Sequence, residues 1–274
     1  QRTKNLIEEY NISPSDILVI TFTKAASNEM KERFYLLMGD RNARVSFGTF
    51  HAVFFTILKS AYNFSSENII SEDMRYRIMR EILSGYMLDY KDENEFIGNL
   101  LGEIGMIKNS RIDINNFYSG VCGEDIFRKI YKEYEARLRK SRLIDFDDML
   151  LYTYELFNQR KDILAAWQKK FKYILIDEFQ DINRIQYEIM KMLAYPQNNM
   201  FIVGDDDQSI YRFRGSRPEI MLNFEKDFPG AKRILLDVNY RCGKYIVETS
   251  KNLISHNKER FDKTITAASE SCEP

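Results

Sequence analysis

Short apolar runs alternate along the chain with longer stretches that have apolar residues at helical spacing. The runs have the length of buried strands, which we predict at residues 17–23, 44–48, 172–176, 200–204 and 232–237. Amphipathic helices are predicted after most of them, at residues 25–37, 50–61, 184–193 and 243–256. Such alternation is typical of an α/β domain, in which helices cover a parallel sheet.

Residues 63–142 break this alternation, because they contain no convincing strand. Helical spacing is present at residues 74–88, 95–108 and 125–139. We therefore predict a helical insertion at 63–142, within an α/β domain formed by residues 1–62 and 143–274. The acidic run that follows predicts a helix N-cap at Asp145, with negative charge in the first turn, rather than a catalytic group.

The composition limits how this protein could bind nucleic acid. The chain has 274 residues, of which 44% are hydrophobic, and this is enough for one large core or two smaller ones. Its 40 basic and 41 acidic residues leave a net charge of −1, whereas a purely electrostatic nucleic-acid binder is usually more basic. Nucleic-acid contacts would then depend on local grooves and on stacking, for which 17 Tyr and 19 Phe are available.

Zinc-binding, His-rich metal-binding and membrane classes are disfavoured. The three cysteines have neither zinc-site spacing nor a disulfide pattern, and two histidines are too few for a His-rich metal site. We see no signal peptide and no apolar run near the ~20 residues of a membrane span. A reducing, cytoplasmic setting fits this pattern best.

Two adjacent carboxylates, Asp177 and Glu178, directly follow the apolar run 173–176. In α/β sheets, ligands bind beyond the carboxyl ends of parallel strands. An Asp placed there can hold Mg²⁺, and a neighbouring Glu can orient or deprotonate a water molecule. The alternative is an acidic turn after a core strand.

Five segments, taken in order, closely resemble motifs Ia, Ib, II, III and IV of the superfamily 1 DNA helicases of the UvrD/Rep/PcrA type. They are residues 21–30, 45–51, 172–181, 204–215 and 236–242. The resemblance spans nearly the whole chain, although residues 63–142 match by position more than by motif. It implies a RecA-like P-loop NTPase fold, in which subdomain 1A carries the inserted helical subdomain 1B.

The resemblance also implies an ATP and Mg²⁺ site. Asp177 would hold Mg²⁺, and Glu178 would be the base that activates the attacking water. Gln208 would sense the γ-phosphate, Arg241 would touch it, and Tyr240 would stack on adenine. Without the resemblance, Gln208 would be a turn residue, and the other two would belong to an ordinary strand-to-helix junction.

Asp205, Asp206 and Asp207 could suggest a second metal. We expect instead a solvated loop that fixes Gln208.

The DNA contacts predicted from the same segments are of two kinds. Aromatic faces stack on any base, which suits a motor that moves along any sequence. The candidates for stacking are Phe22, Phe47, His51, Tyr211 and Phe213. The candidates at strand ends and helix starts, where backbone phosphates could bind, are Thr21, Thr23, Lys24 and Thr49. For the aromatic residues the alternative is core packing.

The phosphate-binding loop of such an NTPase has the pattern G-x-x-x-x-G-K-S/T, which does not occur here. Residues 2–10 look like the end of the helix that follows that loop. We therefore expect a fragment that begins after the loop and ends before the second RecA-like domain, is monomeric, and has little ATPase activity alone.

The leading interpretation is an ATP-dependent 3′–5′ DNA helicase of repair or recombination, with single-stranded DNA and single/double-strand junctions as partners. One alternative is the helicase part of an AddA/RecB-like helicase-nuclease. The other, from a different class, is a non-catalytic module that binds single-stranded DNA.

Overall fold

The computed structural model describes residues 1–211 and 215–269. These residues form two compact units: Gln1–Glu178 with Asn183–Val203, and Phe179–Ile182 with the described residues from Gly204 onward. The first unit contains the elements α1 (Arg2–Glu8), β1 (Ile17–Thr21), α2 (Lys24–Met38), β2 (Ser46–Thr49), α3 (Phe50–Tyr62), α4 (Glu72–Leu83), α5 (Glu93–Ser110), α6 (Glu124–Lys140), α7 (Phe146–Gln159), α8 (Lys161–Lys170), β3 (Tyr173–Ile176), α9 (Arg184–Ala194) and β4 (Met200–Ile202). The second contains the short turns η4 (Phe179–Asp181) and η5 (Asp206–Gln208), the helices α10 (Pro218–Leu222), α11 (Phe224–Asp227) and α12 (Lys244–Ile254), and the strands β5 (Val238–Asn239) and β6 (Thr266–Ala267).

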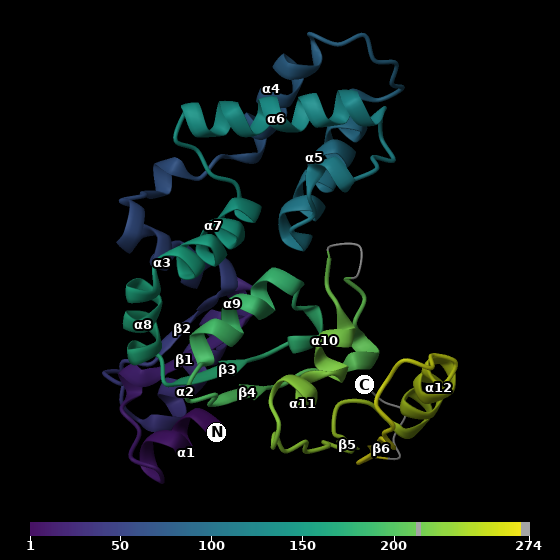
Figure 1. Cartoon of the computed structure of the whole chain (residues 1–274). Helices are drawn as coiled ribbons and strands as arrows, with labels where there is room; N and C mark the ends of the chain where they lie inside the picture. Colours follow the sequence, from purple (N-terminus) through teal and green to yellow (C-terminus); the bar gives the residue numbers. More distant parts are fainter. Residues whose placement is uncertain (212–214, 270–274) are drawn as a thin grey trace. The chain divides into compact units, whose positions relative to one another are not determined.

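Four strands of the first unit form one parallel sheet in the order β2-β1-β3-β4 (Figure 1). This confirms the predicted parallel α/β fold. The observed strands begin and end within two residues of the predicted ones, and every residue of β1 is buried. A strand covered on both faces has no polar side, which explains why it is a continuous apolar run in the sequence.

Helices cover both faces of this sheet. On one face, Ile17, Val19 and Leu175 pack with Leu6 of α1 and Phe34 of α2. Successive side chains of a strand point to opposite faces, so the buried residues between them face the other way. Figure 1 shows α3, α7 and α9 on that second side.

The stretch 63–142 is helical, as predicted, and contains no strand beyond a single bridge between Ile69 and Ile144. Its helices α4, α5 and α6 share an apolar core that includes Met79, Ile104 and Ile130. It belongs to the same compact unit as the sheet. The exact boundaries at residues 62/63 and 142/143 stay a prediction.

The predicted N-cap at Asp145 is confirmed, and it is part of a buried ionic cluster. Asp145 and Asp148 form a capping box, in which each carboxylate accepts the other residue's backbone N–H, at 2.8 and 3.0 Å. The ammonium of Lys108 on α5 contacts both carboxylates, at 3.0 and 2.7 Å, and also Glu135 on α6, at 2.7 Å. The side chains of Lys108, Asp145 and Asp148 are fully buried. This cluster joins the helical stretch to the first turn of α7.

The second unit differs from the sequence prediction in one respect. Residues 232–237 were expected to be a strand, and this prediction is wrong, because these described residues form no strand. Ile234 and Leu236 are each 78% exposed. Pairing begins only after them, where β5 and β6 form a short parallel pair. An apolar run predicts a strand only if a partner strand is available, and among the described residues only the last residue of this run, Asp237, is bonded to β6.

Candidate nucleotide and DNA site

The carboxyl ends of β1, β2 and β3 lie at one edge of the sheet, because the strands end in register. Thr21 is the neighbour of Thr49, and Ile20 is the neighbour of Ile176. The backbone N–H of Asp177 continues this pairing by donating to the carbonyl of Ile20 at 3.0 Å. Residues that follow these three strands are therefore brought together where ligands of α/β proteins bind.

Asp177 and Glu178 lie at this edge, as predicted. Burial raises the pKa of Asp177, and the charge of Glu178 adds to the rise, against a hydrogen bond from the Glu178 backbone. Glu178 has a positive φ of 52°, which is uncommon for a residue other than Gly, Asn or Asp. Such strain is typical of functional sites, where the surrounding structure holds the backbone in place.

The chemistry of this pair suits Mg²⁺. Magnesium is usually held by one or two carboxylates together with waters and substrate phosphates, rather than by a cage of protein ligands. No group of three or more His, Cys, Asp or Glu residues suited to a metal occurs in the part of the chain that the structure describes. Asp177 would hold the cation, and a cation there would relieve the repulsion between two adjacent carboxylates.

The segment after Glu178 is anchored within the second unit. Gln180 is 2% exposed, and its side-chain oxygen accepts the backbone N–H of Asp205 at 3.1 Å. A Cβ on Gly204 would lie 2.6 Å from this oxygen, so the position tolerates only Gly without a shift. Within the second unit, Gln180 and Gly204 thus hold residues 179–182 against the loop that begins at Gly204, roles that the sequence did not reveal.

Gln208 is held by the acidic run that precedes it. Its side-chain amide donates to Asp205 at 2.7 Å, as expected of a loop that fixes Gln208. The run is not a solvated loop, however, because Arg260 and Lys263 form ion pairs with it. That part of the prediction is wrong, since two cations more than fifty residues away in sequence cover the carboxylates.

Tyr240 and Arg241 lie in the turn between β5 and α12. The backbone N–H of Arg241 donates to the side chain of Asn239 at 2.9 Å, and the Tyr240 side chain is 85% exposed. This geometry is that of an Asx turn at a strand-to-helix junction. Their nucleotide-binding roles stay a prediction.

The predicted phosphate contacts lie at two helix N-termini on the sheet edge. Thr23 caps α2 by accepting the N–H of Ala26 at 3.1 Å, and Thr49 caps α3 in the same way at 3.3 Å. Lys24, in the first turn of α2, is exposed. Helix N-termini favour anions through their free N–H groups and the helix dipole.

Thr21 differs from these residues, because its side chain is fully buried and donates to the carbonyl of Thr23 at 2.9 Å. It supports the loop and presents no surface for a direct contact.

The predicted aromatic contacts have different environments. Phe47 packs on Phe34 with ring centroids 5.5 Å apart, and so contributes to the core. Phe22 and Tyr211 are half-buried. Phe213 lies outside the described residues.

His51, on the first turn of α3, meets Phe146 edge to face at 5.4 Å. Burial lowers the pKa of His51, so the ring is neutral near pH 7 and is better suited to packing than to pairing with phosphate. Phe146 is 51% exposed, and sequence reasoning missed it. No local signal distinguished it, because Phe50 is also an aromatic residue at the first position of a capped helix and is buried.

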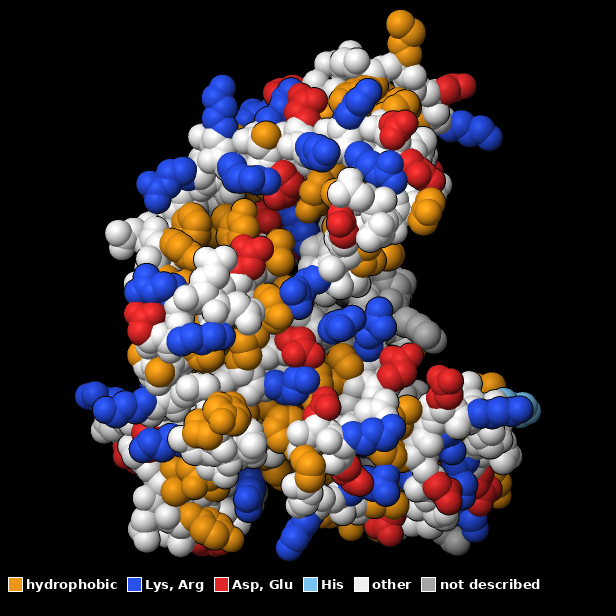
Figure 2. Space-filling view, viewed as in Figure 1, with side chains coloured by type: hydrophobic (Ala, Val, Ile, Leu, Met, Phe, Trp, Pro, Cys, Tyr) orange, Lys and Arg blue, Asp and Glu red, His pale blue; other side chains and the backbone are white. Residues whose placement is uncertain are grey.

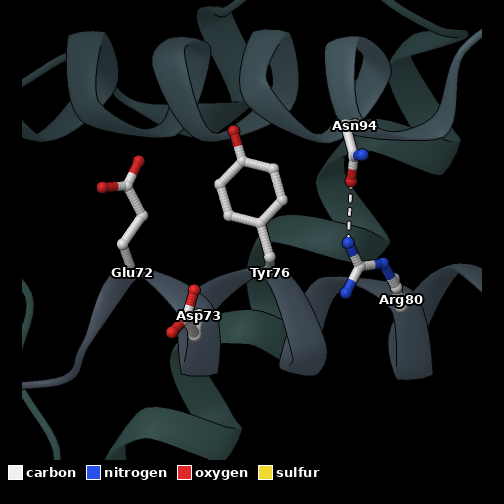
Figure 3. Close-up of a pocket in the computed structure, with 5 residues that line it drawn as sticks. All are labelled: Glu72, Asp73, Tyr76, Arg80 and Asn94. Carbon is white, nitrogen blue, oxygen red and sulfur yellow. Dashed lines mark hydrogen bonds between the residues drawn. The ribbon is translucent and has the colours of Figure 1, made fainter.

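The other surface features do not involve the predicted nucleotide-binding and DNA-binding residues. A hollow of about 340 Å³ on α4 and α5 is lined by Glu72, Asp73, Tyr76, Arg80 and Asn94, and Arg80 donates to Asn94 across it (Figure 3). Figure 2 shows basic and acidic side chains interspersed over the visible face rather than gathered in one basic patch. Among the described residues, no helix has both the length and the apolarity needed to cross a membrane.

A parallel sheet covered by helices, with an acidic pair at its carboxyl edge next to two capped helix N-termini, agrees with a RecA-like α/β domain. The chain belongs to the UvrD/REP helicase N-terminal domain family, which matches residues 1–229.

Individual relatives match almost the whole chain. A protein named putative ATP-dependent DNA helicase YjcD, from Bacillus subtilis, is 40% identical over 273 residues, which cover 97% of this chain and 36% of the relative. Proteins named ATP-dependent DNA helicase PcrA are 35% identical in Leuconostoc citreum and 36% identical in Staphylococcus epidermidis, and the matches cover 36% and 37% of those proteins. The chain therefore spans little more than a third of the length of these relatives.

Proposed function

We propose that this chain is part of an ATP-dependent DNA helicase and supplies the Mg²⁺ ligand and the catalytic base of its ATPase site. The observation that carries the proposal is the acidic pair, with Glu178 in a left-handed conformation, at the carboxyl edge of a sheet that belongs to this family. Asp177 would hold Mg²⁺, whose charge stabilises the phosphates of ATP. Glu178 would accept a proton from the water that attacks the γ-phosphate.

Gln208, Tyr240 and Arg241 complete the proposed nucleotide contacts. The Asp205 hydrogen bond uses one N–H of the Gln208 amide and leaves its oxygen and second hydrogen for a ligand. Arg241 would contact the γ-phosphate, and Tyr240 would stack on the adenine base.

The DNA-binding part of the proposal uses the same sheet edge. The N-termini of α2 and α3, with Thr23, Lys24 and Thr49, would bind backbone phosphates. The neighbouring His51–Phe146 pair would stack on a base, and its edge-to-face arrangement leaves part of the Phe146 ring accessible. Neutral aromatic contacts agree with a chain of net charge −1.

Several finer parts also belong to this proposal: 3′–5′ polarity, binding of single/double-strand junctions, a role in repair or recombination, a monomeric state and a cytoplasmic location. These finer parts follow from the resemblance to superfamily 1 helicases, whereas the family and the names of the relatives support the coarser statement, an ATP-dependent DNA helicase. Unwinding of duplexes that carry either a 3′ or a 5′ single-stranded tail tests the polarity. Faster unwinding from a 5′ tail would contradict it.

The catalytic proposal is tested by ATP hydrolysis with and without single-stranded DNA. Two samples are compared, namely the 274-residue chain and the full-length product of its gene. We expect little or no hydrolysis by the chain alone, since it lacks the phosphate-loop pattern. In the full-length product, Glu178→Gln should lower kcat at least about 10²-fold without weakening ATP binding, because general-base catalysis is worth about that much.

Glu9→Gln is the matched control, because Glu9 is exposed just after α1. Full activity of Glu178→Gln would refute the assignment of the base. DNA binding by the full-length product without any hydrolysis would favour the non-catalytic DNA-binding module.

A further inference from the structure

Two cations hold the loop that carries Gln208. The side chain of Lys263 is 7% exposed, and its ammonium contacts Asp205, Asp206 at 2.6 Å and Asp207 at 3.0 Å. The guanidinium of Arg260 donates to both carboxylate oxygens of Asp207, at 2.7 Å each. Bidentate bonds of this kind fix orientation as well as charge.

The backbone of the same segment also takes part. The N–H of Phe261 donates to the carboxylate of Asp206 at 2.8 Å. The side chain of Asp206 is only 2% exposed, so this contact is shielded from water. We refer to Arg260, Phe261 and Lys263 as the 260–263 clamp.

Asp205 connects the clamp to Gln208. One carboxylate oxygen accepts from Lys263 and from the backbone N–H of Asp207 at 3.2 Å, while the other accepts the Gln208 amide at 2.7 Å. Burial alone would raise the pKa of Asp205, but the hydrogen bonds from Lys263 and Gln208 outweigh burial and lower it. Asp205 therefore stays an ionised acceptor that selects one orientation of the Gln208 amide.

Charge balance gives the clamp a second consequence. Three consecutive carboxylates would repel each other and any approaching phosphate. Arg260 and Lys263 contribute two positive charges against these three negative ones, which leaves a net charge of −1. The loop can then stay compact and be approached by an anionic nucleotide.

We propose that Lys263 and Arg260 are positioning residues for Gln208: they neutralise the acidic run and hold the Gln208 amide in one orientation through Asp205. The consequence for ATP hydrolysis rests on the function proposed above, whereas the positioning itself does not. The clamp lies entirely within the second compact unit.

Hydrogen exchange of the 274-residue chain tests the positioning directly. The backbone N–H of Gln208 donates to the carbonyl of Asp205 at 2.9 Å, and its protection reports on the order of the loop. Lys263→Ala should speed exchange at residues 206–209 about tenfold or more, because the loop opens locally, while α12 changes less than about twofold. Lys263→Arg should restore protection. Lys258→Ala, an equal loss of charge at an exposed position of the same loop, should have no effect.

Unchanged exchange at residues 206–209 in Lys263→Ala would overturn the proposal. Equal acceleration in α12 would also overturn it, since the residue would then serve general stability. If Lys263→Ala does not fold, Arg260→Lys decides, because it keeps the charge and loses the bidentate bond. We expect local acceleration at the same residues, and its absence would overturn the proposal.

The catalytic consequence is measured on the full-length product. Lys263→Ala should lower kcat for ATP hydrolysis about tenfold, because Gln208 acts on the reacting phosphate, and should also raise KM for ATP, because the acidic run then has one less compensating positive charge. Lys263→Arg should recover kcat. If the unsubstituted protein hydrolyses no ATP, the proposed function fails, and the exchange experiment still decides whether the clamp positions Gln208.

Discussion

Replacing Lys108 by Met tests whether the buried ionic cluster holds the helical stretch against α7. Methionine keeps most of the side-chain volume and removes the ammonium, so the change isolates charge from packing. Lys108 lies within 3.0 Å of carboxylate oxygens of Asp145, Asp148 and Glu135. Without it, three buried carboxylates have lost their central cation.

The magnitude follows from the proton that must replace the cation. Burial already raises the pKa of Asp148 to about 7 against the attraction of Lys108, and the charges of Asp145 and Glu135 add to the rise. In Lys108→Met, at least one further carboxyl must become neutral in the folded state. With an unfolded pKa of about 3.9, this costs about 4 kcal/mol at pH 7 and about 2 kcal/mol at pH 5.5. The first value agrees with the ~3–5 kcal/mol lost when one partner of a buried ion pair is removed.

The sign of the pH dependence is fixed by these shifts. A carboxyl whose folded pKa lies above its unfolded pKa is protonated only in the folded state at pH values between the two pKa values. Its penalty is absent below the unfolded pKa and grows as pH rises toward the folded pKa. The destabilisation by Lys108→Met should therefore be larger at pH 7 than at pH 5.5.

Urea unfolding, followed by the fluorescence of Trp167, provides the assay. Trp167 is the only tryptophan and lies on α8, in the same compact unit as the cluster. Lys132→Met on α6 is the control, because Lys132 is exposed and should change stability by less than about 0.5 kcal/mol. A cost below about 1 kcal/mol for Lys108→Met, or the same cost at both pH values, would refute the reasoning.

Three further substitutions test other parts of the structure. Gly204→Ala should lower the melting temperature, because its Cβ would lie 2.6 Å from a buried amide oxygen and overpacking costs ~1–3 kcal/mol. The control Gly102→Ala has open space around its Cβ and should not lower the melting temperature, so equal effects of the two changes would argue against the close approach. Asn183→Ala should lower the free energy of unfolding in urea by ~1 kcal/mol, because it removes the N-cap of α9. Asn183→Ser should keep most of that capping free energy, and an equal loss in both variants would exclude the capping explanation. Phe146→Ala should weaken single-stranded DNA binding by ~1–3 kcal/mol in a fluorescence anisotropy titration if the ring stacks on a base. The control is Tyr10→Ala, which removes an exposed aromatic residue beyond α1. Unchanged affinity of Phe146→Ala would mean that Phe146 does not contact DNA.

The regular elements were predictable because their signals are local. The strands β1 and β3 are short, largely buried apolar runs, whereas β2 and β4 are short runs that are mostly half-buried or exposed. The helices α2, α3 and α9 begin and end within one residue of the predicted bounds. The N-cap at Asp145 was predictable for the same reason, since the capping box joins residues only three positions apart. Placing Asp177 and Glu178 at the carboxyl edge needed only the order of strand and acidic pair.

Interactions between distant residues could not be predicted in this way. The contacts of Lys263 with Asp205 join residues 58 positions apart, and nothing in the local pattern of residues 256–269 distinguishes this lysine from its exposed neighbours. The same holds for Lys108, which looks like one more charged residue at the end of a helix. The wrong strand at 232–237 has the related cause that pairing depends on a partner strand, which periodicity does not reveal.

The acidic pair is held from two directions, and this bears on how it could respond to a ligand. Before the pair, Asp177 is bonded to the sheet through Ile20. After it, Gln180 is buried in the second unit and bonded to Asp205, the residue that orients Gln208. The chain passes from one compact unit to the other directly after Glu178, the residue with the strained backbone. A strained conformation persists only where its surroundings enforce it, so a change in either anchor should alter the backbone of Glu178 before it alters the sheet.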